Sequence, residues 1–277
     1  MTWIALDITT SDERRSALAE WLVARTGQAI EERPDGTLVS FAADEAAAGL
    51  LTVEVMAEGG EGTSVGTRRL DTVDWTLRWR EGLESHRFGR LLVTPSWIAP
   101  EERPGDVTLV LDPENAFGSG AHGSTRAVLA LLERHVKGGE RVLDLGAGSG
   151  ILAIAARMLG AARAVGVETD PDAIAVADNN AARNHVTAGI SFMQGDAGAL
   201  APLLGPADII CSNILRSVNT LIIPAIADAL APQGICFFSG MELAEETPFR
   251  ATLADASWVV LDVQTDAGWW ACAARPA

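Results

Sequence analysis

The sequence predicts an α/β protein whose main domain is a doubly wound, mostly parallel sheet, preceded by a small α+β domain. Three observations support this prediction. A buried-strand pattern at 141–145 leads into a glycine turn and then into a helical pattern at 151–159. Apolar strand patterns then alternate with helical patterns as far as residue 255. The last two strand patterns, at 257–265 and 269–274, follow each other directly and predict an antiparallel hairpin at one edge.

The first 70 residues carry the pattern of a separate small domain. The expected elements are strands at 2–8, near 28–33, at 37–42 and at 64–70, and a helix from Thr10 or Ser11 to about Arg25. The segment 44–58 is ambiguous, because Ala46 to Leu51 favours a helix whereas Thr52 to Val55 favours a strand. With a helix there, the order is βαββαβ, which is a ferredoxin-like domain.

Residues 71–103 are expected to connect this domain, 1–70, to the main domain, 104–277. A helix is predicted from Asp74 to Glu84, with Trp75 and Trp79 on it. Two interpretations are open for this Arg- and Trp-rich connector. It contacts a substrate, or its tryptophans hold the two domains together.

The main domain is expected to alternate strands and helices around one sheet. Strands are predicted at 109–111, 141–145, 164–167, 190–194, 207–212 and 235–239, and helices at 125–135, 151–159, 172–184, 216–230 and near 242–255. Gly146, Glu168, Asp196 and Asn213 each follow the end of a predicted strand. Ligands of such sheets bind at the carboxyl ends of the strands, so these four residues should meet at one site.

The glycine turn indicates which ligand binds. Gly146, Gly148 and Gly150 have the spacing G-x-G-x-G, one residue shorter than the dinucleotide fingerprint. Asp144 at the strand end would repel a pyrophosphate but could pair with an ammonium group, and Glu168 suits a ribose diol. A ligand with an ammonium, a ribose and no phosphate is S-adenosylmethionine. The alternative is an ordinary glycine-rich turn that binds no ligand.

Composition excludes several classes of protein. The net charge of −16 argues against nonspecific nucleic-acid binding and favours a basic macromolecular partner. The three cysteines lie in apolar runs without metal-ligand spacing, so no metal site is expected. No apolar run reaches the roughly 18 residues of a membrane helix, and no signal peptide is recognised at the start. The protein is expected to be cytoplasmic and to have no membrane partner. Because the sequence has no heptad pattern, it is expected to be a monomer.

With these residues in place, the chain resembles the PrmA family, the bacterial methyltransferases of ribosomal protein L11, within the class I S-adenosylmethionine-dependent methyltransferases. The resemblance runs from about Asp74 to the C-terminus. Its motifs are Asp74-Trp75 with Arg87-Phe88-Gly89-Arg90 and Pro95-Ser96-Trp97, the loop from Asp112 to Thr125, the segment 142–156 and Asn213-Ile214-Leu215. The resemblance implies a seven-stranded sheet and a small N-terminal domain that recognises the substrate.

The resemblance also implies roles for individual residues. Cofactor contacts fall on Thr125, Gly146, Glu168 and Asn213, and the adjacent Gly148 belongs to the same turn. Asp196 would receive the adenine amino group, and Asp144 would order the glycine turn or meet the methionyl ammonium. Because the chain has no tyrosine, an aromatic wall would come from Phe117 or a tryptophan. The chain departs from the family in its loop, which reads GSGAHGST rather than GTGTHPTT, and in having Glu168 where aspartate is usual.

The expected chemistry is transfer of a methyl group to an amine, which needs a neutral nucleophile held in line. Asn213 could orient the amine through its side-chain carbonyl, or else bond the cofactor or loop. His122 could accept the amine proton, or else fix the loop. The predicted function is N-methylation of lysine side chains or an N-terminal α-amine of a ribosomal protein. The alternatives are methylation of another protein or a small amine, and a non-catalytic cofactor-binding regulator.

Overall fold

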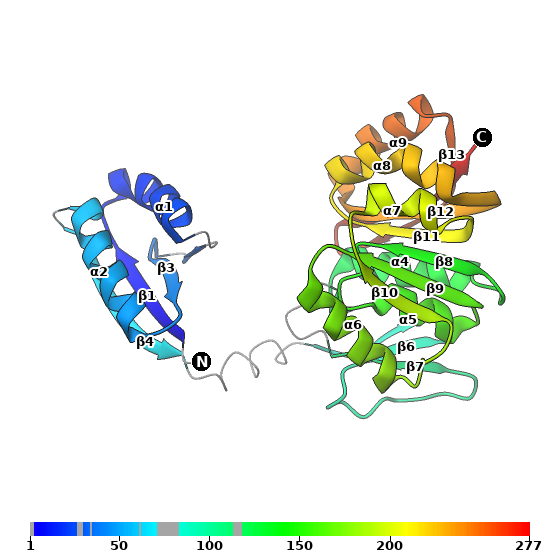
Figure 1. The fold of residues 1–277 in the computed structure, drawn as a ribbon, viewed down its shortest axis with the longest axis horizontal. Helices are drawn as coiled ribbons and strands as arrows, with labels where there is room; N and C mark the ends of the chain where they lie inside the picture. The colour runs from blue at the N-terminus through cyan, green and yellow to red at the C-terminus, as the bar shows by residue number, and fades with distance from the viewer. Residues whose placement is uncertain (1–2, 27–29, 34, 61, 71–82, 113–117) are drawn as a thin grey trace. The chain divides into compact units, whose positions relative to one another are not determined.

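The computed structural model describes residues 3–26, 30–33, 35–60, 62–70, 83–112 and 118–277. The chain divides into two compact units, Met1–Gly82 and Leu83–Ala277 (Figure 1).

The first unit is a four-stranded antiparallel sheet with two helices. Its elements are β1 (Trp3–Thr9), α1 (Asp12–Thr26), β2 (Glu31–Glu32), β3 (Leu38–Ala42), α2 (Glu45–Gly59) and β4 (Ser64–Leu70). The strand order is β2-β3-β1-β4, with β1 paired to both β3 and β4. This order and the βαββαβ sequence confirm the predicted ferredoxin-like arrangement.

The ambiguous segment 44–58 is a helix. Asp44 caps it, because its side chain accepts a hydrogen bond from the Ala47 N–H at 2.8 Å. A strand would place Val53 and Val55 on the same face, yet Val53 is 69% exposed and Val55 is fully buried. Ala48, Leu51 and Val55 have helical spacing and pack into the core of this unit, so tertiary packing decides the conformation.

The second unit contains a seven-stranded sheet with the order β10-β9-β8-β11-β12-β14-β13. Its elements are β8 (Arg141–Leu145), β9 (Arg163–Glu168), β10 (Ile190–Gln194), β11 (Ala207–Asn213), β12 (Leu230–Glu242), β13 (Trp258–Asp266), β14 (Trp269–Pro276), α4 (Gly123–His135), α5 (Ile151–Leu159), α6 (Pro171–Arg183), α7 (Ala197–Leu204), α8 (Arg216–Ala229), η1 (Leu243–Glu245) and α9 (Glu246–Asp255). Strand β14 runs antiparallel to both of its neighbours, as the predicted edge hairpin requires.

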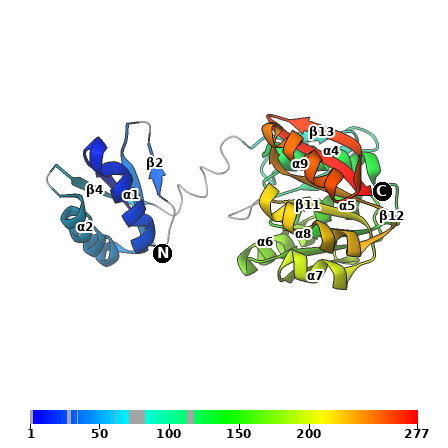
Figure 2. The same ribbon diagram turned by 90° about the horizontal axis from the view of Figure 1, so that it is seen from above.

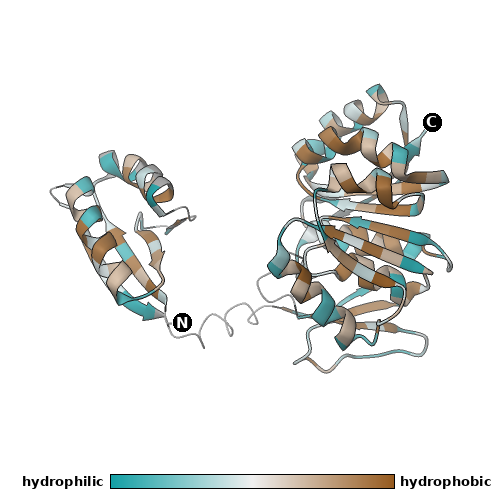
Figure 3. Cartoon of the chain, viewed as in Figure 1, coloured by the Kyte–Doolittle hydropathy of each residue, from teal (hydrophilic) through white to brown (hydrophobic). Residues whose placement is uncertain are grey.

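Helices cover both faces of this sheet (Figures 1 and 2). Residues of α4, α5 and α6 form one apolar core with one face, and residues of α7, α8 and α9 form a second core with the other. The strands accordingly carry long hydrophobic stretches (Figure 3). No helix among the described ranges is both long and apolar enough to cross a membrane.

The structure differs from the predicted elements in two places. In the connector, residues 74–82 of the helix predicted from Asp74 to Glu84 lie outside the described part of the chain. The following residues form β5 (His86–Phe88) and β6 (Leu91–Thr94), which join β7 (Val107–Val110) in a small three-stranded sheet of the second unit. Helix α7 was not predicted, because Gly198 and Pro202 lower its helix propensity, and its buried Ala201 packs into the core beside α8.

The strand order positions the site. From β8 the chain continues outward to β9 and β10, and it then returns to β11 on the other side of β8. The helices that follow β8 and β11 therefore lie on opposite faces of the sheet, which opens a crevice at the carboxyl ends of these two strands.

Candidate active site

A cavity of about 560 Å³ lies at the carboxyl ends of the strands. Six of the predicted site residues line it: His122, Gly146, Gly148, Glu168, Asp196 and Asn213. The remaining lining residues are Ser124, Val167, Thr169, Gly195, Ala197, Ile214, Leu215, Val218, Gly240 and Trp269. Gly146, Glu168, Asp196 and Asn213, the four strand-end residues expected to meet, are thus brought together with His122, Ser124 of α4 and Gly240 of β12.

The glycine turn has a left-handed backbone that packs closely against the end of β11. Gly146 has φ +77°, and a Cβ atom there would lie 2.6 Å from Ile214 Cγ2. Gly150, with φ +79°, sits at the N-cap of α5. The backbone N–H of Gly148 donates to Glu168 Oε2 at 2.8 Å, which ties the turn to the end of β9.

Two carboxylates stand on neighbouring strand ends of the cavity wall. Glu168 Oε1 accepts hydrogen bonds from the N–H groups of Thr169 at 2.7 Å and Asp170 at 3.1 Å. Asp196 caps α7, since its Oδ1 accepts from the Ala199 N–H at 2.9 Å. Both side chains are held in place by backbone N–H groups and face the cavity, so they can receive hydroxyl or amino donors of a ligand.

Asp144 lies beneath the turn and is fully buried, outside the cavity lining. Its Oδ2 accepts from the Ala153 N–H in the first turn of α5 at 3.2 Å, and its Oδ1 has no hydrogen-bond partner in the part of the chain that the structure describes. Burial, with a further contribution from Glu168, raises the pKa of Asp144 to about 7. This position favours the role of ordering the turn over direct contact with an ammonium.

Asn213 presents an unused acceptor. Its Nδ2 donates to Thr125 Oγ1 at 3.2 Å, while its Oδ1 is buried and has no hydrogen-bond partner among the described residues. Thr125 is itself fully buried and stands behind Asn213 rather than in the cavity wall. A buried amide oxygen lacking a partner is costly, so this atom is set to accept a hydrogen bond from a ligand.

The strand end that carries Asn213 is clamped by Asn219 of α8. Asn219 Nδ2 donates to the carbonyls of Ile214 at 3.0 Å and Ser239 at 2.9 Å, and its Oδ1 accepts from Ser212 Oγ at 2.6 Å. Gly240 is required next to this clamp, because a Cβ there would lie 2.3 Å from the Ile214 carbonyl oxygen. The backbone on both sides of Asn213 is therefore fixed.

The 118–123 loop forms the opposite wall. Gly118 accepts a hydrogen bond from Ser149 Oγ at 2.7 Å, which joins the loop to the glycine turn. His122 Nδ1 lies 2.7 Å from Ser124 Oγ, and its ring centroid is 4.2 Å from that of Trp269. Burial and the charge of Arg126 lower the pKa of His122, so the imidazole is neutral near pH 7.

The C-terminal hairpin braces this loop. Arg126 in α4 forms an ion pair with Asp266, and a Cβ at Gly123 would lie 2.6 Å from the Asp266 carbonyl oxygen. Trp269 of β14 supplies the aromatic wall that the sequence assigned to Phe117 or a tryptophan, and Phe117 lies outside the described residues. Leu215 belongs to the Asn213-Ile214-Leu215 motif, whereas no sequence pattern marked Val218 or Gly240 as lining residues, since only the packing of α8 and β12 brings them to the cavity.

The residues at this cavity fit S-adenosylmethionine. Gly146 and Gly148 line the cavity without side chains, Glu168 and Asp196 line it at the ends of β9 and β10, and the sheet has one antiparallel strand, β14, next to its edge. This combination defines a class I S-adenosylmethionine-dependent methyltransferase.

Comparisons with known proteins identify the family of the chain within this class. Residues 2–276 match the family described as "Ribosomal protein L11 methyltransferase (PrmA)", and the chain belongs to this family. A ribosomal protein L11 methyltransferase of Pelotomaculum thermopropionicum is 39% identical over 217 residues, covering 78% of this chain and 70% of the relative. One from Azotobacter vinelandii is 34% identical over 291 residues and covers 97% of both chains.

A solved structure supports the same assignment. The crystal structure of a ribosomal protein L11 methylase from Lactobacillus delbrueckii subsp. bulgaricus superimposes with a TM-score of 0.63 and 28% sequence identity, covering 70% of this chain and 99% of that chain. The chain is therefore a protein methyltransferase that uses S-adenosylmethionine.

Proposed function

We propose that this enzyme N-methylates amino groups of ribosomal protein L11, on lysine side chains, the N-terminal α-amine or both. The names of its relatives support the choice of substrate. The observation in the molecule that carries the proposal is the buried, unpartnered Oδ1 of Asn213 in the cavity wall. An amine N–H is the donor that this acceptor lacks.

The residues of the site have separate tasks in this proposal. S-adenosylmethionine, when bound, supplies an electrophilic methyl group, and Gly146, Gly148, Glu168 and Asp196 would hold it. Asn213 Oδ1 accepts one N–H of the neutral amine and so directs its lone pair. His122, neutral near pH 7, takes up the proton that the amine must lose.

The surroundings of the cavity favour an aliphatic amine. Trp269, Leu215 and Val218 give it an apolar wall, against which the methylene chain of a lysine can pack while its nitrogen reaches Asn213. When a substrate side chain covers this apolar wall, the loss of water around its nitrogen favours the uncharged amine over ammonium. The net charge of −16 suits a basic substrate protein.

We further propose that the N-terminal unit recognises the substrate protein and that the enzyme acts as a monomer in the cytoplasm, where ribosomal proteins are made. The described residues that line the cavity belong to the second unit, and we assign recognition rather than chemistry to the ferredoxin-like unit.

A radiolabel assay tests the substrate. The purified enzyme is incubated with S-adenosylmethionine carrying a labelled methyl group and a bacterial ribosomal-protein extract. A labelled band that comigrates with purified L11 is the expected result, with Asn213→Ala as the inactive control. If the label is found only on another protein or on a small amine, that acceptor and not L11 is the substrate. Cofactor binding without transfer to any acceptor would contradict an enzymatic role.

A further inference from the structure

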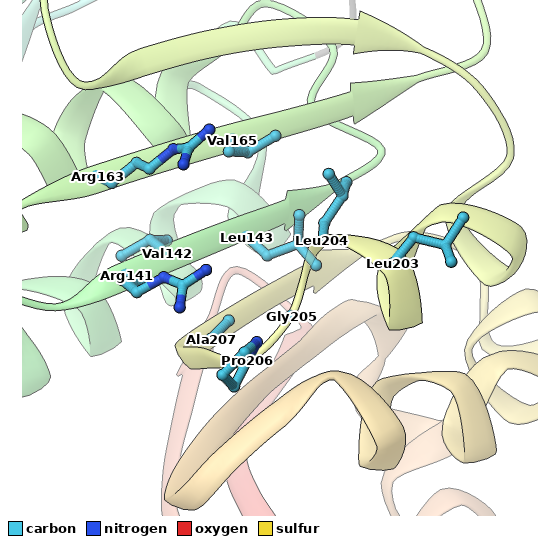
Figure 4. A pocket seen from close by; sticks show the side chains of 10 residues that line it. All are labelled: Arg141, Val142, Leu143, Arg163, Val165, Leu203, Leu204, Gly205, Pro206 and Ala207. Carbon is cyan, nitrogen blue, oxygen red and sulfur yellow. The ribbon is translucent and has the colours of Figure 1, made fainter.

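A second pocket lies at the opposite, amino-terminal edge of the main sheet. It has a volume of about 230 Å³ and is bounded by β8, β9, the end of α7 and the start of β11 (Figure 4). Its lining consists of Arg141, Val142, Leu143, Arg163, Val165, Leu203, Leu204, Gly205, Pro206 and Ala207. None of these residues takes part in the methyl-transfer site.

Two arginines stand side by side in this pocket. Arg141 and Arg163 are register partners on the parallel strands β8 and β9, and Figure 4 shows both guanidinium groups extending the same way. Like charges at paired positions on neighbouring strands destabilise a sheet. An anion bound between the two guanidinium groups would offset their mutual repulsion.

The protein itself supplies no such anion in the described part of the chain. Neither guanidinium has an ion pair or a hydrogen bond there. Two neighbouring carboxylates accept backbone N–H groups instead of pairing with a guanidinium: Glu140 accepts those of Lys137 and Gly138, and Asp208 accepts that of Arg141.

The lining residues other than the two arginines have no polar side chain. Helix α7 ends at Leu204 and leaves the amino-terminal ends of β8 and β9 uncovered on this face. Leu143 and Val165 lie on the same face as the two arginines, two residues further along each strand. Leu203, which is 77% exposed, and Pro206 form the side wall. The pocket therefore offers two positive charges at one end and apolar surface beside them.

We propose that this pocket binds an oxyanion with two negative charges, of the phosphate-monoester type. The two planar guanidinium groups can each donate two parallel hydrogen bonds to such a group, and its charge cancels theirs. A single carboxylate would cancel only one charge. The apolar wall accommodates an organic substituent on the phosphate.

Binding can be measured by calorimetry and thermal unfolding with the full chain at pH 8 and constant ionic strength. The probes are inorganic phosphate and phenyl phosphate, with acetate and chloride for comparison. We expect both phosphates to bind and the acetate to have no effect. Tighter binding of phenyl phosphate would identify an organic monoester as the ligand, and equal binding would identify free phosphate.

Two variants and a control decide whether the arginines form the site. Arg141→Gln and Arg163→Gln should each weaken phosphate binding at least tenfold, and should unfold at the same or a higher temperature without phosphate, because the repulsion is relieved. Arg103→Gln, an exposed arginine of the same unit, should bind phosphate normally. Equal phosphate binding in all four proteins, or no binding to the unsubstituted protein, would overturn the proposal.

Discussion

Asn213 and Thr125, which are 88 residues apart in the sequence, are joined by one buried hydrogen bond from Asn213 Nδ2 to Thr125 Oγ1 at 3.2 Å. This bond uses the donor end of the amide within the protein. The acceptor end, Oδ1, is buried and has no hydrogen-bond partner in the described part of the chain, and in the proposed mechanism it accepts from the substrate amine.

Asn213→Ala should lower kcat by about 10²- to 10³-fold, as does the loss of one oriented hydrogen-bonding group in other active sites. Thr125→Val should lower kcat less, because the amide remains but is free to turn. Steady-state kinetics with L11, together with calorimetric measurement of S-adenosylmethionine affinity, separates the chemical step from cofactor binding. Retention of kcat within about twofold in Asn213→Ala would remove this residue from the mechanism.

Gly146→Ala should weaken S-adenosylmethionine binding by at least about tenfold, because the added Cβ would lie 2.6 Å from Ile214 Cγ2 within the cofactor turn. Gly146→Arg should abolish binding. Gly139→Ala is the matched control, since Gly139 also has positive φ but a Cβ there meets no atom within 4 Å. The control should lose some stability through backbone strain and keep its cofactor affinity. Equal affinities for Gly146→Ala and the unsubstituted protein would refute the assignment of the turn.

Asp144 should make the protein less stable as the pH rises from about 4 to about 7. Its pKa is about 7 in the folded protein against 3.8 ordinarily, so over this range the folded state binds more protons than the unfolded state. At about 1.36 kcal/mol per pH unit, the full effect is on the order of 4 kcal/mol.

Asp144→Asn should remove much of this dependence, because asparagine keeps an acceptor for the Ala153 N–H and carries no charge. Urea unfolding of both proteins at pH 5, 6, 7 and 8 measures the difference. Parallel curves of unfolding free energy against pH would show that Asp144 does not titrate in this range.

His122→Ala should lower kcat about 10²-fold and flatten the acidic limb of the pH–rate profile, because the group that accepts the amine proton is lost. The lowered pKa of His122 places this limb below the ordinary range of histidine. His135→Ala serves as the control, since His135 is bonded to Asp262 and does not line the cavity. An unchanged acidic limb combined with a raised KM would instead assign His122 to fixing the loop.

The parts of the fold that the sequence predicted well have strong local signals. The strand, turn and helix from 141 to 159 follow from apolar periodicity and three glycines, and the strand ends that carry Glu168 and Asn213 follow from the same alternation. Helix α7 and strands β5 and β6 escaped prediction because they are short or contain glycine and proline. They depend on contacts with distant elements rather than on propensity.

The same distinction holds for the site. Residues at strand ends could be placed from the sequence because parallel strands bring their carboxyl ends to one edge. Trp269 could not, because its position depends on how β14 inserts between β12 and β13 and on contact with His122, about 150 residues earlier. Local patterns also assigned Asp144 two possible roles, and only its complete burial distinguishes them.

The ion pair between Arg126 and Asp266 and the contact of His122 with Trp269 have a consequence for biosynthesis. The loop wall gains its support only once residues 266–269 have been made, and the clamp on the strand that carries Asn213 needs Ser239 of β12. Residues near the C-terminus thus complete a site whose glycine turn lies about 120 residues earlier in the chain. Release of the finished chain, rather than synthesis of the glycine turn, therefore sets the moment at which the whole site can form.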